Sequence, residues 1–172
     1  MTNTWFISDT HFGHEGTASY FKRPDGTPLR PFKNADHQDE VLIKNWNAVV
    51  KPEDRVYHLG DFCMRRAKLD VLHRLNGRIA FVLGNHDPWD LGTWRKYPNV
   101  THLLGYKVYP EHGLICSHVP ISLMQLQSRF KFNAHGHMHA HTMDDPRYIN
   151  VCVEHTNYTP ISFDELLSRM NG

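Results

Sequence analysis

Short apolar runs that each end in a cluster of polar residues recur along the chain. Five of them read WFISD, RVYHLGD, RIAFVLGNHD, LICSHVP and FNAHGHMH. An apolar run of roughly four to eight residues bounded by turn-forming residues is typical of a buried β-strand. We therefore expect five strands, each of which runs out into a polar loop.

Helical spacing appears between these runs. Over residues 35–50 the apolar positions recur three and four residues apart and form one face, made of Leu42, Trp46, Val49 and Val50. This pattern stops at the Lys51-Pro52 pair, where proline ends the helix. Strands that alternate with helices predict an α/β fold.

Two shorter helices are expected from their end signals. One covers residues 68–75 and ends at Asn76-Gly77, with the glycine as its C-terminal cap. The other opens at Ser162, which forms a capping box with Glu165, and runs to about residue 170.

Length and composition fit one soluble globular domain over residues 1–172. Apolar residues make up 40% and charged residues 22%, which are ordinary values for this class. The chain has nineteen basic and eighteen acidic residues, so its net charge does not indicate a nucleic-acid or anionic membrane partner.

Neither the first residues nor the cysteine pattern indicates export, so we expect a cytoplasmic protein. No apolar run reaches the roughly 20 residues of a membrane span, and the first residues do not resemble a signal peptide. The three cysteines, Cys63, Cys116 and Cys152, form no CxxC pair, which is typical of a reducing compartment. The sequence does not determine the oligomeric state.

Fourteen histidines are the compositional anomaly. In the stretch AHGHMHAH every second residue is a histidine, so His135, His137, His139 and His141 would share one side of an extended chain. Taken alone, the stretch is compatible with core histidines, a surface tract or half of a metal site.

The polar residues that follow the strands favour the third interpretation. They are Asp9 and His11, Asp61, Asn85 and His86, His118, and His137 and His139. Loops at the carboxyl ends of strands converge in open α/β folds, so these side chains are expected to meet there.

In order, the motifs are D-x-H, G-D, G-N-H-D, S-H and G-H-x-H. This ordered set resembles the calcineurin-like metallophosphoesterase superfamily from about Phe6 to Pro160. The stretches SDTHFGH, NWN and VYHLGDF are most similar to its small bacterial and phage members. The resemblance implies an αββα sandwich, in which two mixed β-sheets pack together and helices flank them.

The resemblance also implies a dinuclear metal centre. One cation would be held by Asp9, His11 and His139, the second by Asn85, His118 and His137, and both by Asp61 and a bridging hydroxide. All protein donors are nitrogen or oxygen, which favours Mn²⁺ and also suits iron or zinc. Two divalent cations, two aspartates and one hydroxide leave about +1 of charge, which suits a phosphoester.

The activity so implied is metal-dependent hydrolysis of a phosphoester by in-line attack of the bridging hydroxide. His86 would protonate the leaving-group oxygen or brace the phosphate. We favour a phosphodiesterase because small family members often act on phosphodiesters, synthetic aryl diesters included, and the substrate could be derived from a nucleotide. The alternatives are a phosphomonoesterase acting on a nucleotide or sugar phosphate and a non-catalytic scaffold with the same fold.

One position departs from the pattern of the serine/threonine phosphatases in this superfamily. Met64 stands where those enzymes carry the aspartate that orients the catalytic histidine, so the sequence does not show what orients His86. Arg65 matches their phosphate-binding arginine, although a solvated charge at a helix start explains it equally well. His14 is expected to contact phosphate or hydroxide, or to be an unrelated loop histidine.

Other residues with reactive or charged side chains have simpler interpretations. We expect Cys63 and Cys116 to be buried small hydrophobes and His58 to be a hydrogen-bonded core residue. His135 and His141 are expected at the surface or beside the ligand histidines.

The loop over residues 20–34 is basic and rich in proline, and it could overhang the site. There Arg23 and Arg30 would meet a second phosphate or a leaving group, or would be solvated charges. Trp89 and Trp94 would pack in a helix or stack on an aromatic group.

Overall fold

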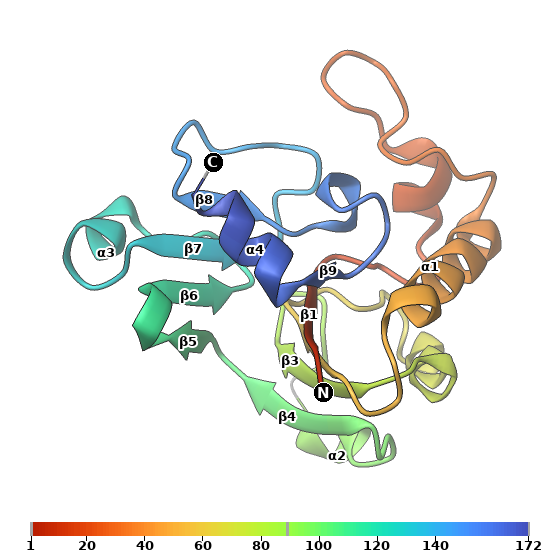
Figure 1. Cartoon of the computed structure of the whole chain (residues 1–172). Coiled ribbons are helices and arrows are strands. Elements are labelled where there is room, and N and C mark those ends of the chain that lie inside the picture. The colour runs from red at the N-terminus through yellow and green to blue at the C-terminus, as the bar shows by residue number, and fades with distance from the viewer. Residues whose placement is uncertain (1, 89, 172) are drawn as a thin grey trace.

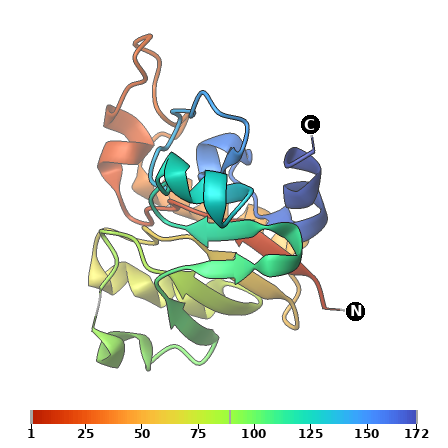
Figure 2. The same cartoon turned by 90° about the vertical axis from the view of Figure 1, so that its left-hand side faces the viewer.

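Two β-sheets packed face to face form the centre of the molecule, with helices on the outside (Figures 1 and 2). A computed structural model describes residues 2–88 and 90–171. Within these residues no helix has the length and apolar character needed to cross a membrane. The predicted sandwich of two mixed sheets flanked by helices is confirmed.

The first sheet has the strand order β4-β3-β2-β1-β9. Its members are β1 (Thr4–Ile7), β2 (Arg55–His58), β3 (Arg78–Val82), β4 (Val100–Leu104) and β9 (Ile161–Ser162). Strands β1 to β4 pair in parallel, whereas β9 pairs antiparallel to β1.

The second sheet has the order β5-β6-β7-β8. It consists of β5 (Lys107–Tyr109), β6 (Leu114–Ser117), β7 (Phe132–His135) and β8 (Tyr148–Asn150). Only β5 is antiparallel to its neighbour. Each of the five predicted strands is present in one of the two sheets.

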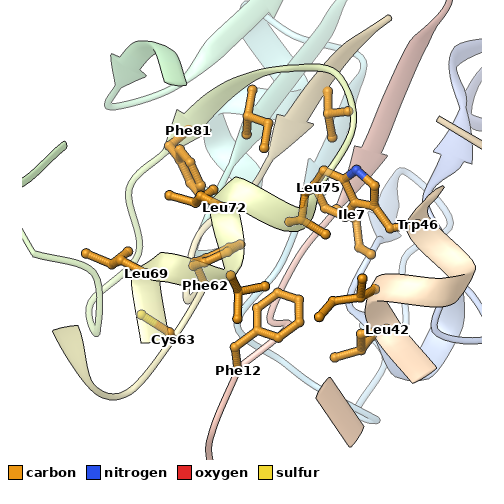
Figure 3. Close-up of a cluster of buried hydrophobic side chains, with 14 of the residues drawn as sticks. Ile7, Phe12, Leu42, Trp46, Phe62, Cys63, Leu69, Leu72, Leu75 and Phe81 are labelled. Atoms are coloured by element: carbon orange, nitrogen blue, oxygen red, sulfur yellow. The ribbon is translucent and has the colours of Figure 1, made fainter. Parts of the chain in front are cut away.

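Successive side chains along the strands of the first sheet point to opposite faces, so the buried side chains fall into two cores. Phe6 and Tyr57 pack with Leu114 and Ala134 of the second sheet, and so fill the space between the sheets. Residues of the opposite parity, Ile7, Val56, Ile79 and Phe81, pack against the helices on the outer face. Figure 3 shows this outer core, where Phe12 and Phe62 lie between Leu42 and Leu69.

The long helix α1 (Ala35–Val49) begins at Asn34, whose side chain accepts a hydrogen bond from the His37 amide at 2.8 Å. Its predicted apolar face is buried, apart from the half-buried Val49. The shorter helices are α2 (Leu91–Trp94), α3 (Leu123–Ser128) and α4 (Phe163–Arg169). The predicted capping box is confirmed in part, because the Ser162 hydroxyl accepts from the Glu165 amide.

The helix predicted over residues 68–75 differs from the prediction in type and bounds. It is a 3₁₀ helix, η2 (Arg66–Arg74). Leu69, Leu72 and Leu75 are spaced by three residues and all are buried, and this spacing lines one face of a helix with three residues per turn. Gly77 does not cap the helix; it takes a φ of 94° in the turn before β3.

Three further short helices lie in the loops: the π-helical turn η1 (Gly16–Tyr20), η3 (Pro110–His112) and η4 (Val153–His155).

The loops after β1 and β2 run side by side at the carboxyl end of the first sheet. The amides of Asp9, His11 and Phe12 donate in turn to the carbonyls of residues 60, 61 and 62. At this same end, Ser8 and Cys152 form a parallel bridge that joins the two sheets. The polar loops are thereby held at the seam of the sandwich.

Candidate metal centre

Six of the seven expected ligands form two groups at this seam. Asp9, His11 and His139 make the first group, and Asp61, His118 and His137 make the second. In each group the candidate ligand atoms lie within 4.8 Å of one another. The seventh expected ligand, Asn85, belongs beside the second group, because its Oδ1 lies 3.0 Å from His118 Nε2.

Asp61 belongs to the second group and also faces the first. Its Oδ2 is 3.7 Å from His11 Nε2 on one side and 3.4 Å from His118 Nε2 on the other. Its Oδ1 accepts a hydrogen bond from the His86 amide at 2.9 Å, so the carboxylate is fixed. This is the position that a carboxylate shared by two cations requires.

Several buried polar atoms of the first group have no hydrogen-bond partner within the described part of the chain. They are Asp9 Oδ1 and both ring nitrogens of His11. A buried polar atom without a partner is costly, and a bound cation would supply one. The donor set and these orphaned atoms therefore fit a metal centre.

Backbone strain is concentrated at the same residues. Among residues 2–88 and 90–171, seven non-glycine residues have a positive φ, and five of these are expected ligands. The five are Asp9 (57°), His11 (48°), Asp61 (56°), His137 (66°) and His139 (48°). The left-handed conformation is unfavourable for side chains with a Cβ and recurs at functional sites, where surrounding structure holds it in place.

Two motif glycines let the aspartates pack against the backbone. A Cβ atom at Gly84 would collide with Asp61 Oδ1, and one at Gly136 would collide with Ser8 Oγ and Asp9 Oδ2. Both collisions involve buried groups that have no room to withdraw. The glycines of G-N-H-D and G-H-x-H are therefore required because these side chains pack directly against the backbone there.

The carboxylates and histidines of the two groups shift one another's pKa values. Burial acts to raise the pKa of Asp9, but His11 and the neighbouring histidines outweigh it and hold the pKa far below its usual range. Burial acts to lower the pKa of His118, but Asp61 and Asp9 outweigh it and raise the pKa to about 9. The carboxylates are therefore ionised and suited to a cation.

A buried network stands behind the first group. Glu154 Oε1 accepts from Arg30 Nε at 2.8 Å and lies 3.1 Å from His139 Nδ1. The Glu154 and Arg30 side chains are fully buried. Burial opposes ionisation of Glu154, but Arg30 and His139 outweigh it and lower its pKa to about 2. With Nδ1–H donating to this carboxylate, Nε2 of His139 is left to face Asp9.

Arg30 contradicts both interpretations of the sequence. It is 1% exposed, so it is not a solvated charge, and it faces inward rather than toward a substrate. Its guanidinium donates to the carbonyl oxygens of Asp9 (2.6 Å) and Thr10 (3.0 Å). Arg30 therefore fixes the strained loop that carries the first two expected ligands.

The sequence left open what orients His86, and the structure shows how the loop that carries it is held. The Asp87 carboxylate accepts from the amides of Asp61 (2.8 Å), Phe62 (2.8 Å) and Gly84 (2.9 Å). It thereby joins the G-N-H-D loop to the G-D loop. His86 is exposed, and its ring lies 5.7 Å from that of His11.

Comparison with known proteins agrees with this geometry. The family model of the calcineurin-like phosphoesterases matches residues 2–170. The chain belongs to this family. Calcineurin-like phosphoesterases hydrolyse phosphoesters and are typically dependent on divalent metals.

Relatives of similar size extend the match over nearly the whole chain. The uncharacterized protein MJ1445 of Methanocaldococcus jannaschii is 35% identical over 175 residues, which cover 95% of this chain and 89% of the relative. Gene 66 protein of Mycobacterium phage D29 is 31% identical over 186 residues, with 88% and 87% covered. The crystal structure of AQ665, a protein of unknown function from Aquifex aeolicus, is 27% identical with a TM-score of 0.71 and covers 96% of this chain and 98% of that one.

Two positions expected to contact substrate lie differently with respect to the centre of this calcineurin-like phosphoesterase. His14 is half-buried beside His11, with a ring separation of 5.5 Å, and burial lowers its pKa to about 4. Arg65 and Met64 are exposed at the start of η2. The structure places His14 beside the first group. Arg65 lies on the surface, four residues after Asp61 in the sequence.

The histidines outside the two groups lie in different environments. His58 is fully buried and hydrogen-bonded, with Nε2 3.0 Å from Thr10 Oγ1, which confirms its core role. His135 is also fully buried and lies directly before Gly136, whereas His141 is exposed.

The cysteine and tryptophan predictions can be assessed in part. Cys63 and Cys116 are buried as predicted, and burial raises the pKa of the Cys63 thiol to about 12. Trp94 packs in the outer core and donates to the Pro88 carbonyl, which confirms a packing role. Trp89 lies outside the described residues.

Sequence reasoning missed Glu154, gave Asp87 no role and expected Arg30 to meet a substrate or solvent. Asp87 belongs to the G-N-H-D motif, so its position beside the site was visible. Glu154 and Arg30 are 124 residues apart and carry no motif, so nothing in the sequence indicated their pairing.

Proposed function

We propose that the protein is a dinuclear metal-dependent phosphodiesterase. The observation that carries this proposal is the position of Asp61, which belongs to one group of nitrogen and oxygen donors and faces the other. Asp9, His11 and His139 would hold one cation, and Asn85, His118 and His137 the other, with Asp61 shared. Nitrogen and oxygen donors favour manganese, iron or zinc, and of these we propose Mn²⁺.

When bound, the two cations would supply hydroxide at neutral pH and neutralise charge on the phosphate. The chain's own residues would orient the reactants. Asp87 and the Asp61 carboxylate hold the backbone that carries His86, and the exposed ring of His86 can reach a substrate from solvent. We assign it to proton donation to the leaving-group oxygen.

His14 and Arg65 remain proposed phosphate contacts. For His14 the support is its place beside His11 and its low pKa, which keeps the ring neutral near the centre. For Arg65 the support is its match to the family motif. Three buried free cysteines also support our proposal of a cytoplasmic protein.

The preference for diesters rests on the likeness to small family members. Initial rates on bis(4-nitrophenyl) phosphate and 4-nitrophenyl phosphate, measured separately with Mn²⁺, Zn²⁺ and Fe²⁺, test it. With Mn²⁺, we expect nitrophenol release from the diester to be at least about 10-fold faster than release from the monoester. The Asp61→Asn variant serves as the blank. His86→Ala should keep its metal content and lose at least about 100-fold in turnover.

A faster rate on the monoester would replace the proposal with a phosphomonoesterase. Rates equal to the Asp61→Asn blank on both substrates with all three metals would overturn hydrolysis altogether. Near-normal turnover of His86→Ala would remove that residue from the reaction.

A further inference from the structure

A cavity of about 470 Å³ lies beside the first group of expected ligands. One wall is the segment Phe21–Leu29 and the other is the segment His139–His141. A volume of this size accommodates a small organic ligand. In Figure 1 the first wall belongs to the orange loop that extends beyond η1.

The Phe21–Leu29 wall is folded back on itself. Lys22 and Pro28 form an antiparallel bridge, and the Leu29 amide donates to the Phe21 carbonyl at 2.7 Å. Across the turn, the Arg23 amide donates to the Thr27 carbonyl at 2.8 Å. The wall is thus a hydrogen-bonded hairpin with a defined shape.

The cavity adjoins the proposed metal centre at His139. His139 lines it, and the Nε2 atom of the same residue lies 3.9 Å from Asp9 Oδ1. Phe21 also lines it, and its ring lies 5.5 Å from that of His14. His86 does not line the cavity. A phosphate at the centre would therefore extend one substituent toward His86 and the other past His139 into the cavity.

The lining combines apolar surface with a small excess of positive charge. Phe21, with 49% of its surface exposed, and Pro24 offer apolar faces. Lys22 and Arg23 are cationic and Asp25 is anionic, so one net positive charge remains.

The Asp25 carboxylate is already engaged within the hairpin, where it accepts from the amide (2.9 Å) and hydroxyl (2.6 Å) of Thr27. Arg23 makes one long hydrogen bond, from Nη2 to the Leu29 carbonyl at 3.4 Å. Its guanidinium, together with the Lys22 ammonium, is thus placed to pair with an anion on a ligand.

We propose that this cavity binds the substituent that stays on phosphorus, and that it selects a flat group carrying a second negative charge, as in a nucleoside with an additional phosphate. This inference rests on the proposed phosphodiesterase function. Lys22 and Arg23 supply the charge recognition, while Phe21 and Pro24 contact the flat part.

A matched pair of substrates tests the proposal. Thymidine 5′-(4-nitrophenyl phosphate) and its 3′-phosphorylated derivative share the leaving group and differ only in the added phosphate. We expect the Mn²⁺-loaded protein to have a kcat/KM at least about 10-fold higher for the derivative, the size of one charge-assisted hydrogen bond. Arg23→Ala should reduce this preference to about 2-fold, mainly through KM, and Lys22→Ala should reduce it less.

Arg78→Ala is the matched control, because Arg78 is exposed at the start of β3, the end of that strand away from Asn85. It should keep the full preference. No preference in the natural protein, or an equal loss in Arg78→Ala, would overturn the proposal.

Calorimetry with thymidine 3′,5′-bisphosphate separates the cavity from the reaction. Binding at least about 5-fold weaker in Arg23→Ala than in Arg78→Ala supports the cavity even if no ester is hydrolysed. Equal affinities in all the proteins overturn it, even if bis(4-nitrophenyl) phosphate is a substrate.

Discussion

At the scale of single residues, the expected ligands combine strain with incomplete hydrogen bonding. Left-handed backbone at Asp9, Asp61 and His137 costs free energy that a metal-free protein does not recover. The orphaned atoms of Asp9 and His11 add to this cost. Such residues are expected to lower the stability of the metal-free protein.

His137 allows this strain to be measured, because its side chain is exposed and contributes little packing. At its φ of 66°, His137→Gly should raise the free energy of unfolding of the metal-free protein by about 1 kcal/mol relative to His137→Ala. Urea unfolding in EDTA measures the difference. Equal stability of the two variants would show that the left-handed backbone stores no strain there.

Glu154 allows the orientation of His139 to be tested. Glu154→Gln keeps an oxygen that can accept from His139 but removes its charge, so we expect the first cation to bind about 10- to 100-fold more weakly. Metal titration by calorimetry measures this, with circular dichroism to check folding. The control is Glu40→Gln, an exposed carboxylate paired with Arg74. Unchanged affinity in Glu154→Gln would limit Glu154 to a structural role.

At the scale of elements, the outer core depends on helix η2. Leu72 is fully buried in the cluster with Phe62 and Phe81, so Leu72→Ala should cost about 2–5 kcal/mol of stability. Leu123→Ala is the control, because Leu123 is 44% exposed on α3 and should cost less than about 1 kcal/mol. Urea denaturation measures both. A cost for Leu72→Ala no larger than the control would mean that η2 contributes little to the core.

The elements show what the sequence could and could not predict. The strands were predictable because each buried run ends at a motif residue such as Asp9 or Asp61. The type of η2 was not, because leucines spaced by three residues are compatible with an α-helix as well as a 3₁₀ helix. The role of Arg30 was missed because its partner Glu154 comes close only in the folded chain.

At the scale of the whole molecule, stability is expected to depend on pH through His58. Gly60 N–H donates to its Nδ1, and Nε2–H can donate to Thr10, so the buried ring fits its neutral form. Burial lowers its pKa from 6.5 to about 3. Between these values the unfolded chain binds the proton and the folded chain does not, so stability falls as pH decreases.

The metal-free protein should therefore lose up to about 1.4 kcal/mol per pH unit through this group as pH falls below about 6.5. His58→Gln removes the group, so its stability should vary less with pH over this range. Urea unfolding at several pH values compares the two. The same slope in both proteins would exclude His58 as a source of acid sensitivity.

The seam between the sheets has a mechanical consequence. Asp9, His11, Asp61 and Asn85 follow strands of the first sheet, whereas His118, His137 and His139 follow strands of the second. Each cation would then be bound by ligands from both sheets at once. Removing the cations would free only this edge, whereas the core between the sheets and the Ser8–Cys152 bridge would still hold the two halves together.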